Sequence, residues 1–186
     1  MEQKQEEKAL YYFRIKTEWV AANEVGALDK TKTEELVVAA NYTDAEKTAY
    51  AIAEDQNRYE FGSVNIEIIK TKIDDVKFND VLCQDEGMVN GLICNYFEEE
   101  AESGVGLYAV TIATYTKHET TGKVKATKST VYTPALGSTD AVKRITKLMS
   151  ESPVDYVVRD VKFDNAAAIY WPSDMHQSKT KEFDLQ

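Results

Sequence analysis

The same order of sequence patterns occurs twice in this chain, and this doubling is the feature that most limits the possible folds. Thr43-Asp44-Ala45 and Thr139-Asp140-Ala141 each open a segment that carries apolar residues at helical spacing. An acidic residue in the first turn is typical of a helix start, because the helix dipole favours negative charge there. Extended segments flank both helices. The sequence therefore predicts two copies of one strand–strand–helix–strand unit.

Alternating apolar and polar residues predict the strands of each unit. In the first unit we predict strands over residues 10–20, 34–40 and 64–73, and in the second over residues 108–114, 124–136 and 155–163. Tyr108 aligns with Tyr11 at the start of each unit. The predicted fold class is α+β, with two ββαβ repeats, a mostly antiparallel sheet, one helix per repeat and an approximate twofold relation between the repeats.

The predicted helices differ in their apolar stripes. The first is expected to begin at Thr43, with a capping box formed by Thr43 and Glu46. Its inner face consists of small residues that allow close approach to a sheet: Ala45, Ala49, Ile52 and Ala53. The second helix is expected to direct larger side chains inward, namely Val142, Ile145, Leu148 and Met149.

The chain divides into five predicted segments. A mobile N-terminal lead (residues 1–10) precedes the first repeat (11–81), and an acidic linker (82–105) follows it. Within the linker, Asn90-Gly91 predicts the turn of a short hairpin. The second repeat covers residues 106–171, and a polar tail covers residues 172–186.

The net charge of −10 is unevenly distributed. Residues 11–76 carry 13 acidic and 8 basic residues, whereas residues 106–171 carry 6 acidic and 9 basic residues. Such asymmetry favours two faces with different partners. No apolar run is long enough to cross a membrane, and no secretion signal is visible, so we expect a cytoplasmic protein in a bacterial or phage-infected cell.

The helix start after a strand, together with the aromatic-centred strand after each helix, resembles an uncharacterised domain family. That family occurs in Bacteroidetes and in phages that infect them, including crAss-like phages. The resemblance involves residues 37–46, 61–78 and 154–171. It implies a phage context and transfers no catalytic residue. The acidic segment between the repeats is longer here than in the family pattern.

The sequence shows no constellation of residues typical of an enzyme, so we predict that the protein has no catalytic residues, metal or cofactor. Neither of the two histidines, His118 and His176, lies next to a serine or cysteine in a nucleophile-elbow motif. The sequence also contains no glycine-rich phosphate-binding loop motif. Cys83 and Cys94 lack the further ligands that a zinc site needs and are expected to be reduced thiols. Asp44 is explained by its helix start.

Basic and aromatic residues gather in the second repeat. The candidate nucleic-acid-binding residues are Lys117, Lys123, Lys125, Lys128, Tyr115, Tyr132 and Arg144. Single strands are held by cations along the phosphates and by aromatic rings against which bases stack. Lysines also commonly protect a sheet edge from pairing with other chains, and tyrosines commonly pack within sheets, so each residue taken singly fits a structural role as well.

Two functions follow from these patterns. The first is a non-enzymatic accessory protein that binds single-stranded nucleic acid, in phage replication. It requires the four lysines to share a face with an exposed Tyr115 or Tyr132. The alternative is a protein-interaction or structural module without a nucleic-acid role, whose acidic linker recruits a protein partner.

Overall fold

Two long hairpins, each followed by a helix and a third strand, make up most of the computed structural model, which describes residues 9–77 and 86–172. The first unit contains β1 (Tyr11–Ala22), β2 (Leu28–Ala39), α1 (Tyr42–Asp55) and β3 (Asn65–Thr71). The second contains β7 (Gly106–Lys117), β8 (Val124–Ala135), α2 (Ser138–Met149) and β9 (Asp155–Asp164). Most of the predicted lead and tail, together with His176 and Cys83, lies outside the described residues.

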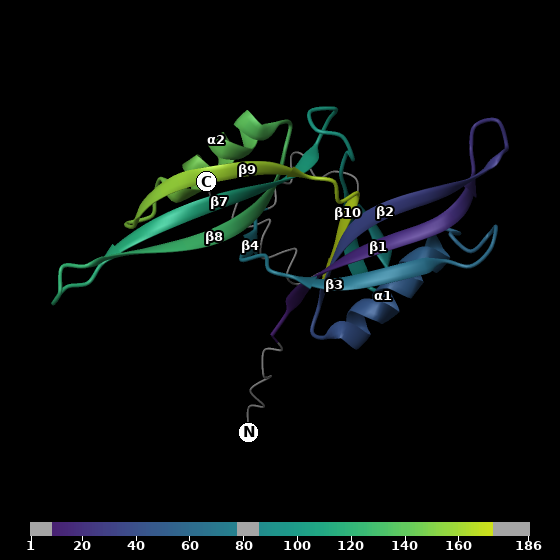
Figure 1. Cartoon of the computed structure of the whole chain (residues 1–186), viewed down its shortest axis with the longest axis horizontal. Coiled ribbons are helices and arrows are strands. Elements are labelled where there is room, and N and C mark those ends of the chain that lie inside the picture. The colour runs from purple at the N-terminus through teal and green to yellow at the C-terminus, as the bar shows by residue number, and fades with distance from the viewer. Residues whose placement is uncertain (1–8, 78–85, 173–186) are drawn as a thin grey trace, which may run out of the picture.

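Four shorter strands complete two sheets (Figure 1). They are β4 (Asp75–Val76), β5 (Glu86–Val89), β6 (Leu92–Tyr96) and β10 (Ala168–Pro172). One sheet has the order β3-β1-β2-β10-β6-β5 and the other the order β4-β8-β7-β9. All the pairs are antiparallel except β2 with β10 and β4 with β8. The part of the chain that the structure describes is therefore a mixed α+β fold with mostly antiparallel sheets.

In each of the two parallel pairs, a strand that follows one unit along the chain pairs with a strand of the other unit. Strand β4 follows the first unit along the chain, yet it pairs with β8 of the second. Strand β10 follows the second unit and pairs with β2 of the first, where Ile169 lies opposite Leu36. β10 also pairs with β6, so it joins β2 to the β5–β6 hairpin. Each sheet is completed by a strand from the other half of the chain.

The β5–β6 hairpin turns at Asn90-Gly91, where both residues have positive φ, 50° and 75°. Residues with positive φ at both central positions form the tight turn that matches the twist of paired strands. The hairpin belongs to the six-stranded sheet, and the acidic loop after β6 leads from it to β7 of the other sheet. Its residues Glu98, Glu99, Glu100 and Glu102 are exposed.

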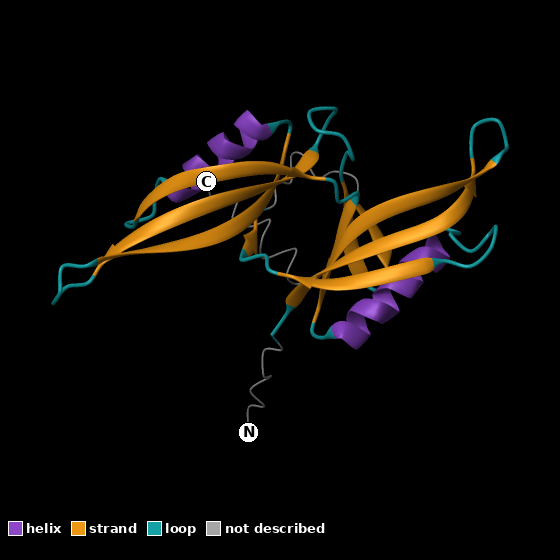
Figure 2. Cartoon of the chain, viewed as in Figure 1, coloured by secondary structure: helices purple, strands orange, loops and turns teal. Residues whose placement is uncertain are grey.

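Each sheet carries one helix on one face (Figure 2). Helix α1 buries the four small and branched residues that its spacing predicts, against Phe13, Ile15 and Val37. Its N-cap is Asn41, whose Oδ1 accepts a hydrogen bond from the Asp44 N–H at 2.9 Å, and α1 begins at Tyr42, one residue before the predicted start. The predicted capping box of Thr43 with Glu46 was therefore wrong, because the cap lies two residues earlier. Asn41 occupies the extended conformation that an N-cap needs, whereas Thr43 is already helical.

Helix α2 packs against β7 through Ile145, Leu148 and Met149. Ala141 completes this contact, and Val142 is not part of the cluster. On β7 the same cluster includes Tyr108, which is buried, whereas Tyr11 is 40% exposed. The alignment of Tyr108 with Tyr11 was therefore wrong. In the first unit it is Phe13 that packs beneath a helix as Tyr108 does.

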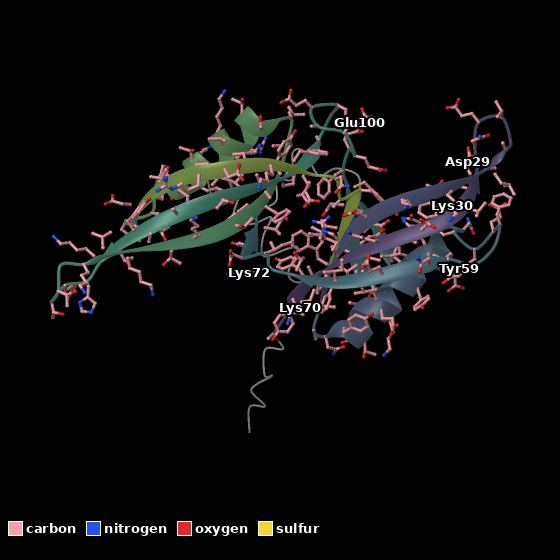
Figure 3. The ribbon with its side chains drawn as sticks, in the orientation of Figure 1. Asp29, Lys30, Tyr59, Lys70, Lys72 and Glu100 are labelled. Atoms are coloured by element: carbon pink, nitrogen blue, oxygen red, sulfur yellow. The ribbon has the colours of Figure 1, made fainter. Side chains whose placement is uncertain are left out.

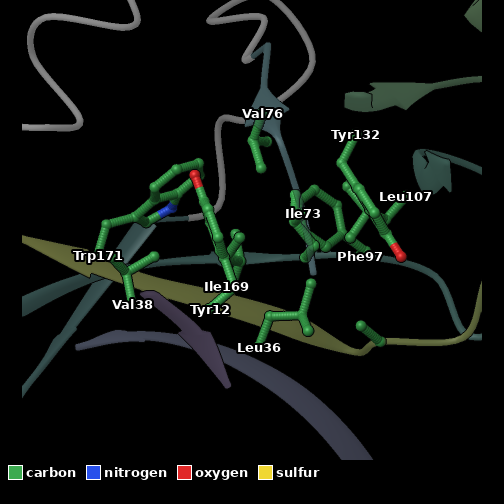
Figure 4. Packing of buried hydrophobic residues seen from close by; sticks show 11 residues of the cluster. Tyr12, Leu36, Val38, Ile73, Val76, Phe97, Leu107, Tyr132, Ile169 and Trp171 are labelled. Atoms are coloured by element: carbon green, nitrogen blue, oxygen red, sulfur yellow. The ribbon is translucent and has the colours of Figure 1, made fainter. Parts of the chain in front are cut away.

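A third hydrophobic cluster joins the two sheets (Figure 4). It forms on the faces that the helices leave uncovered, with Leu36 and Val38 from β2, and Leu107 and Tyr132 from the second unit. Trp171 and Ile169 of β10 are completely buried within it. Because the cluster draws on both units, the burial of apolar surface that stabilises one sheet also holds the other in place.

Candidate nucleic-acid interface

The end of the β7–β8 hairpin extends past its neighbouring strands. Strand β9 pairs with β7 only as far as Tyr115, while the hairpin continues to the Lys117–Val124 pair. At the tip, His118 donates its N–H to the Lys123 carbonyl at 2.9 Å, and Gly122 takes a positive φ of 66°. The segment forms a two-stranded projection at one end of the molecule (Figure 1). We refer to residues 115–128 as the lysine hairpin.

All four hairpin lysines are exposed. Lys117 ends β7, Lys123 lies in the turn, and Lys125 and Lys128 lie on β8. None of them forms an ion pair within residues 9–77 and 86–172, in contrast with Lys30 and Lys32 of the other long hairpin, which both bind Glu18. The lysine hairpin therefore presents cations that the rest of the described chain does not neutralise.

The register divides these lysines between two faces. Lys128 lies opposite Ala113 and faces the same side as Tyr115, Tyr132 and Lys117, since residues two apart or directly paired share a face. Lys125 lies opposite Thr116 and faces the side covered by α2. The expectation that all four lysines share one face was wrong. Period-two alternation separates Lys125 from Lys128, because they are three residues apart.

The two candidate tyrosines have different environments. Tyr132 is only 8% exposed and packs in the cluster between the sheets. Burial, together with the charge of Asp164, raises the pKa of Tyr132 to about 12. A base cannot stack on this ring, so its assignment to a binding surface was wrong. Tyr115 is half-buried, and its hydroxyl accepts a hydrogen bond from Arg159.

Arg144 is engaged within its own helix. Its Nε donates to Oδ2 of Asp140 at 2.9 Å, and the same carboxylate accepts the Leu136 N–H at 3.0 Å. Burial acts to raise the pKa of Asp140, but the hydrogen bonds from Arg144 and Leu136 outweigh it and hold this pKa below its ordinary value. Arg144 therefore stabilises the start of α2, and the structure does not bring it to the Tyr115 face.

The lysine hairpin also has open backbone edges. In the described part of the chain, β4 is the strand that pairs with the outer side of β8, at Val131 and Tyr132. Thr130 is also hydrogen-bonded to Asp74 on this side, through both its carbonyl and its N–H, whereas within the described ranges residues 124–129 are paired with β7 alone. Charged residues on such a strand discourage pairing with other chains, so edge protection remains a role for Lys125 and Lys128 that needs no ligand.

A buried polar cluster under the C-terminal end of α1 was not anticipated from the sequence. Arg58 and Glu35 are each 2% exposed and form an ion pair, and the Arg58 guanidinium lies 4.5 Å from the centre of the Trp19 ring. Gln56 bridges this pair to the Tyr170 hydroxyl. Arg58 follows the helix in a polar loop, so no periodicity marks it as internal. Glu35 stands between Glu34 and an apolar run that begins at Leu36, so the sequence gives only a weak signal that it is internal.

Cys94 lies beside this cluster and is buried. Burial raises the pKa of its thiol to about 11, with the nearby Tyr96 and Tyr170 hydroxyls acting in the opposite direction. A thiol in this state is a poor nucleophile. Among the described residues there is also no group of three or more histidine, cysteine or carboxylate side chains that could hold a metal ion.

Comparisons with known proteins give one match. Residues 11–173 match the model of a family described as a domain of unknown function, DUF4494. Comparison with curated proteins and comparison with solved structures each found no match. In the described part of the chain, no helix has the length and apolar character needed to span a membrane.

Proposed function

We propose that this protein, which belongs to the DUF4494 family, is a non-enzymatic accessory protein that binds single-stranded nucleic acid with its lysine hairpin. The observation that carries the proposal is the group of four exposed hairpin lysines without an ion pair in the described part of the chain. Phosphates supply most of the affinity of such proteins, through release of counterions.

The arrangement of the lysines favours a particular mode of contact. Because Lys125 and Lys128 face opposite sides of the ribbon, a strand lying flat on one sheet face would meet only some of the cations. A strand that crosses the end of the hairpin passes both sides and the tip lysine Lys123. With Tyr132 buried, phosphate contacts dominate this mode, and Tyr115 is the one candidate ring left at the hairpin base.

Fluorescence anisotropy with a labelled oligo-dT tests the proposal. Four phosphate contacts predict that the logarithm of affinity falls with the logarithm of salt concentration with a slope of about −3. Changing both Lys123→Gln and Lys125→Gln should reduce the magnitude of that slope by about 1.4. The matched control is Lys30→Gln with Lys32→Gln, which removes the same charge at the same spacing from the β1–β2 hairpin of the first unit.

Two results would refute the proposal. One is the absence of binding at micromolar protein in low salt. The other is an equal loss of affinity in both double variants, because this would reflect net charge and not the lysine hairpin.

The origin and setting of the protein form part of the proposal. The strand orders β3-β1-β2 and β9-β7-β8, and the reciprocal positions of β4 and β10, support a duplicated ββαβ unit with an approximate twofold relation. We place the protein in the cytoplasm of a bacterial or phage-infected cell, and its role in phage replication among Bacteroidetes. Detecting the protein by mass spectrometry in fractions of infected cells would test this setting.

A protein-interaction module is the second candidate function. It is favoured by the outward face of α1, where Tyr42 and Tyr50 are 53% and 50% exposed among carboxylates. Aromatic rings at the surface commonly mark contact sites with other proteins. The exposed acidic loop after β6 is a further surface for a basic protein partner.

A further inference from the structure

The outward face of α1 combines aromatic rings with carboxylates. Tyr42, Glu46, Tyr50 and Glu54 follow one another at intervals of four residues, which places them along one side of the helix. Both tyrosines are about half exposed, Glu54 is exposed, and Glu46 is partly buried. The buried side of the helix is formed by different residues, so this face contributes nothing to the core.

The loop after α1 extends this surface. Burial and the neighbouring Tyr50 and Glu54 all raise the pKa of Tyr59. Glu54, Asn57, Tyr59 and Glu60 line a shallow hollow of about 560 Å³. Figure 3 shows Tyr59 at this end of the molecule. We refer to Tyr42, Glu46, Tyr50, Glu54, Tyr59 and Glu60 as the acidic–aromatic face.

This face has the chemistry of a site for ammonium groups. Neither Glu54 nor Glu60 forms an ion pair with any residue in the described ranges. A lysine ammonium gains from a carboxylate and also from the face of a tyrosine ring, and the gain is larger where water is partly excluded. The hollow at Tyr59 offers both kinds of group together.

We propose that the acidic–aromatic face binds the lysine hairpin of a second copy of this protein. The argument is charge complementarity, because the hairpin offers exposed lysines and the α1 face offers exposed carboxylates, each without partners in the described chain. The two surfaces cannot meet within one molecule, since the hairpin and α1 lie at opposite ends of its longest axis (Figure 1). The inference goes beyond the proposed function and does not require nucleic acid.

Contact between two different surfaces is heterologous, and it produces rings or open chains of copies. The assembly should therefore grow with protein concentration. It should weaken as salt rises, because both surfaces are exposed and are screened at physiological ionic strength.

Sedimentation velocity of the full chain, at about 100 µM protein and low salt, tests the proposal with charge reversals on either side. The hairpin variant combines Lys123→Glu with Lys125→Glu, and the helix variant combines Glu54→Lys with Glu60→Lys. Each variant alone should sediment as a monomer, because like charges then face each other. An equimolar mixture should assemble again, because each reversed surface now meets an oppositely charged one. The control, Glu99→Lys with Glu100→Lys in the exposed acidic loop, should assemble like the unchanged protein.

The proposal would be overturned if the unchanged protein stayed monomeric under all conditions, or if the helix variant alone still assembled. It would also be overturned if the mixture stayed monomeric while circular dichroism showed that both variants are folded. The helix variant leaves the lysine hairpin intact and should still bind oligo-dT. If the mixture assembles while oligo-dT fails to bind the unchanged protein, only the proposed nucleic-acid function falls.

Discussion

Arg14 of β1 and Asp164 at the end of β9 join the two sheets through a pair of hydrogen bonds, at 3.0 and 2.5 Å. The Arg14 guanidinium also donates to Glu34 at 3.0 Å. Burial acts to lower the pKa of Arg14, but the hydrogen bond and charge of Asp164 outweigh it and raise this pKa. Arg14 and Asp164 are 150 residues apart, and the pair lies beside the hydrophobic cluster between the sheets.

We expect this pair to contribute measurably to the free energy of unfolding. Its side chains are only 16% and 9% exposed, so their interaction is poorly screened. A double-mutant cycle with Arg14→Met and Asp164→Asn, followed by urea denaturation, should give a coupling energy of about 1–3 kcal/mol. The comparison pair is Lys30 and Glu18, whose lysine is 75% exposed and whose coupling should be below about 1 kcal/mol. Equal coupling in the two pairs would contradict the role given to Arg14.

The reciprocal strands predict that neither half of the chain folds independently. A cut between Ala101 and Glu102, in the exposed loop, separates β10 from the β2 and β6 strands that it joins. We expect residues 1–101 alone to lack dispersed amide signals in NMR spectra. Mixing with residues 102–186 should restore them in a one-to-one complex. A dispersed spectrum from residues 1–101 alone would show that β10 is dispensable.

Asp140 should make stability depend on pH. Its pKa is lowered in the folded protein, so its contribution is present above the ordinary carboxyl pKa and is lost as the pH falls through the lowered value. Asp140→Asn should reduce the free energy of unfolding by about 0.5–1 kcal/mol at neutral pH, and the difference should shrink below about pH 4. Arg144→Met should remove most of the same pH dependence. A difference that stays constant with pH would exclude the charge of Asp140 as the cause.

Cys94 should be chemically protected by the fold. A thiol with a pKa of about 11 is almost entirely protonated at pH 8. In a Cys83→Ser background, where Cys94 is the one remaining cysteine, the native protein should react with a disulfide reagent about 100-fold more slowly than the urea-unfolded protein. Stopped-flow absorbance can measure both rates. Similar rates in the two states would place the thiol in contact with solvent.

Local sequence determined the elements of this protein and much of their burial. The apolar stripe from Ala45 to Ala53 predicts the buried face of α1, because a helix repeats its contacts every three to four residues. Alternation in β1 and β7 predicts their strands in the same way, and the Asn90-Gly91 pair predicts its tight turn. These features depend on neighbours along the chain. The alignment of Tyr108 with the first unit was wrong by two residues, because strand register depends on the partner strand and not on neighbours along the chain.

Only the tertiary structure decided which residues share a surface. The exchange of β4 and β10, the burial of Tyr132 and the bond between Arg14 and Asp164 all join segments that are distant in sequence. Pairing register and packing decided that Lys128 shares a face with Tyr115, whereas Lys125 lies on the side that α2 covers. Backbone pairing and side-chain packing are contacts between strands, and a single strand's pattern does not specify its partner.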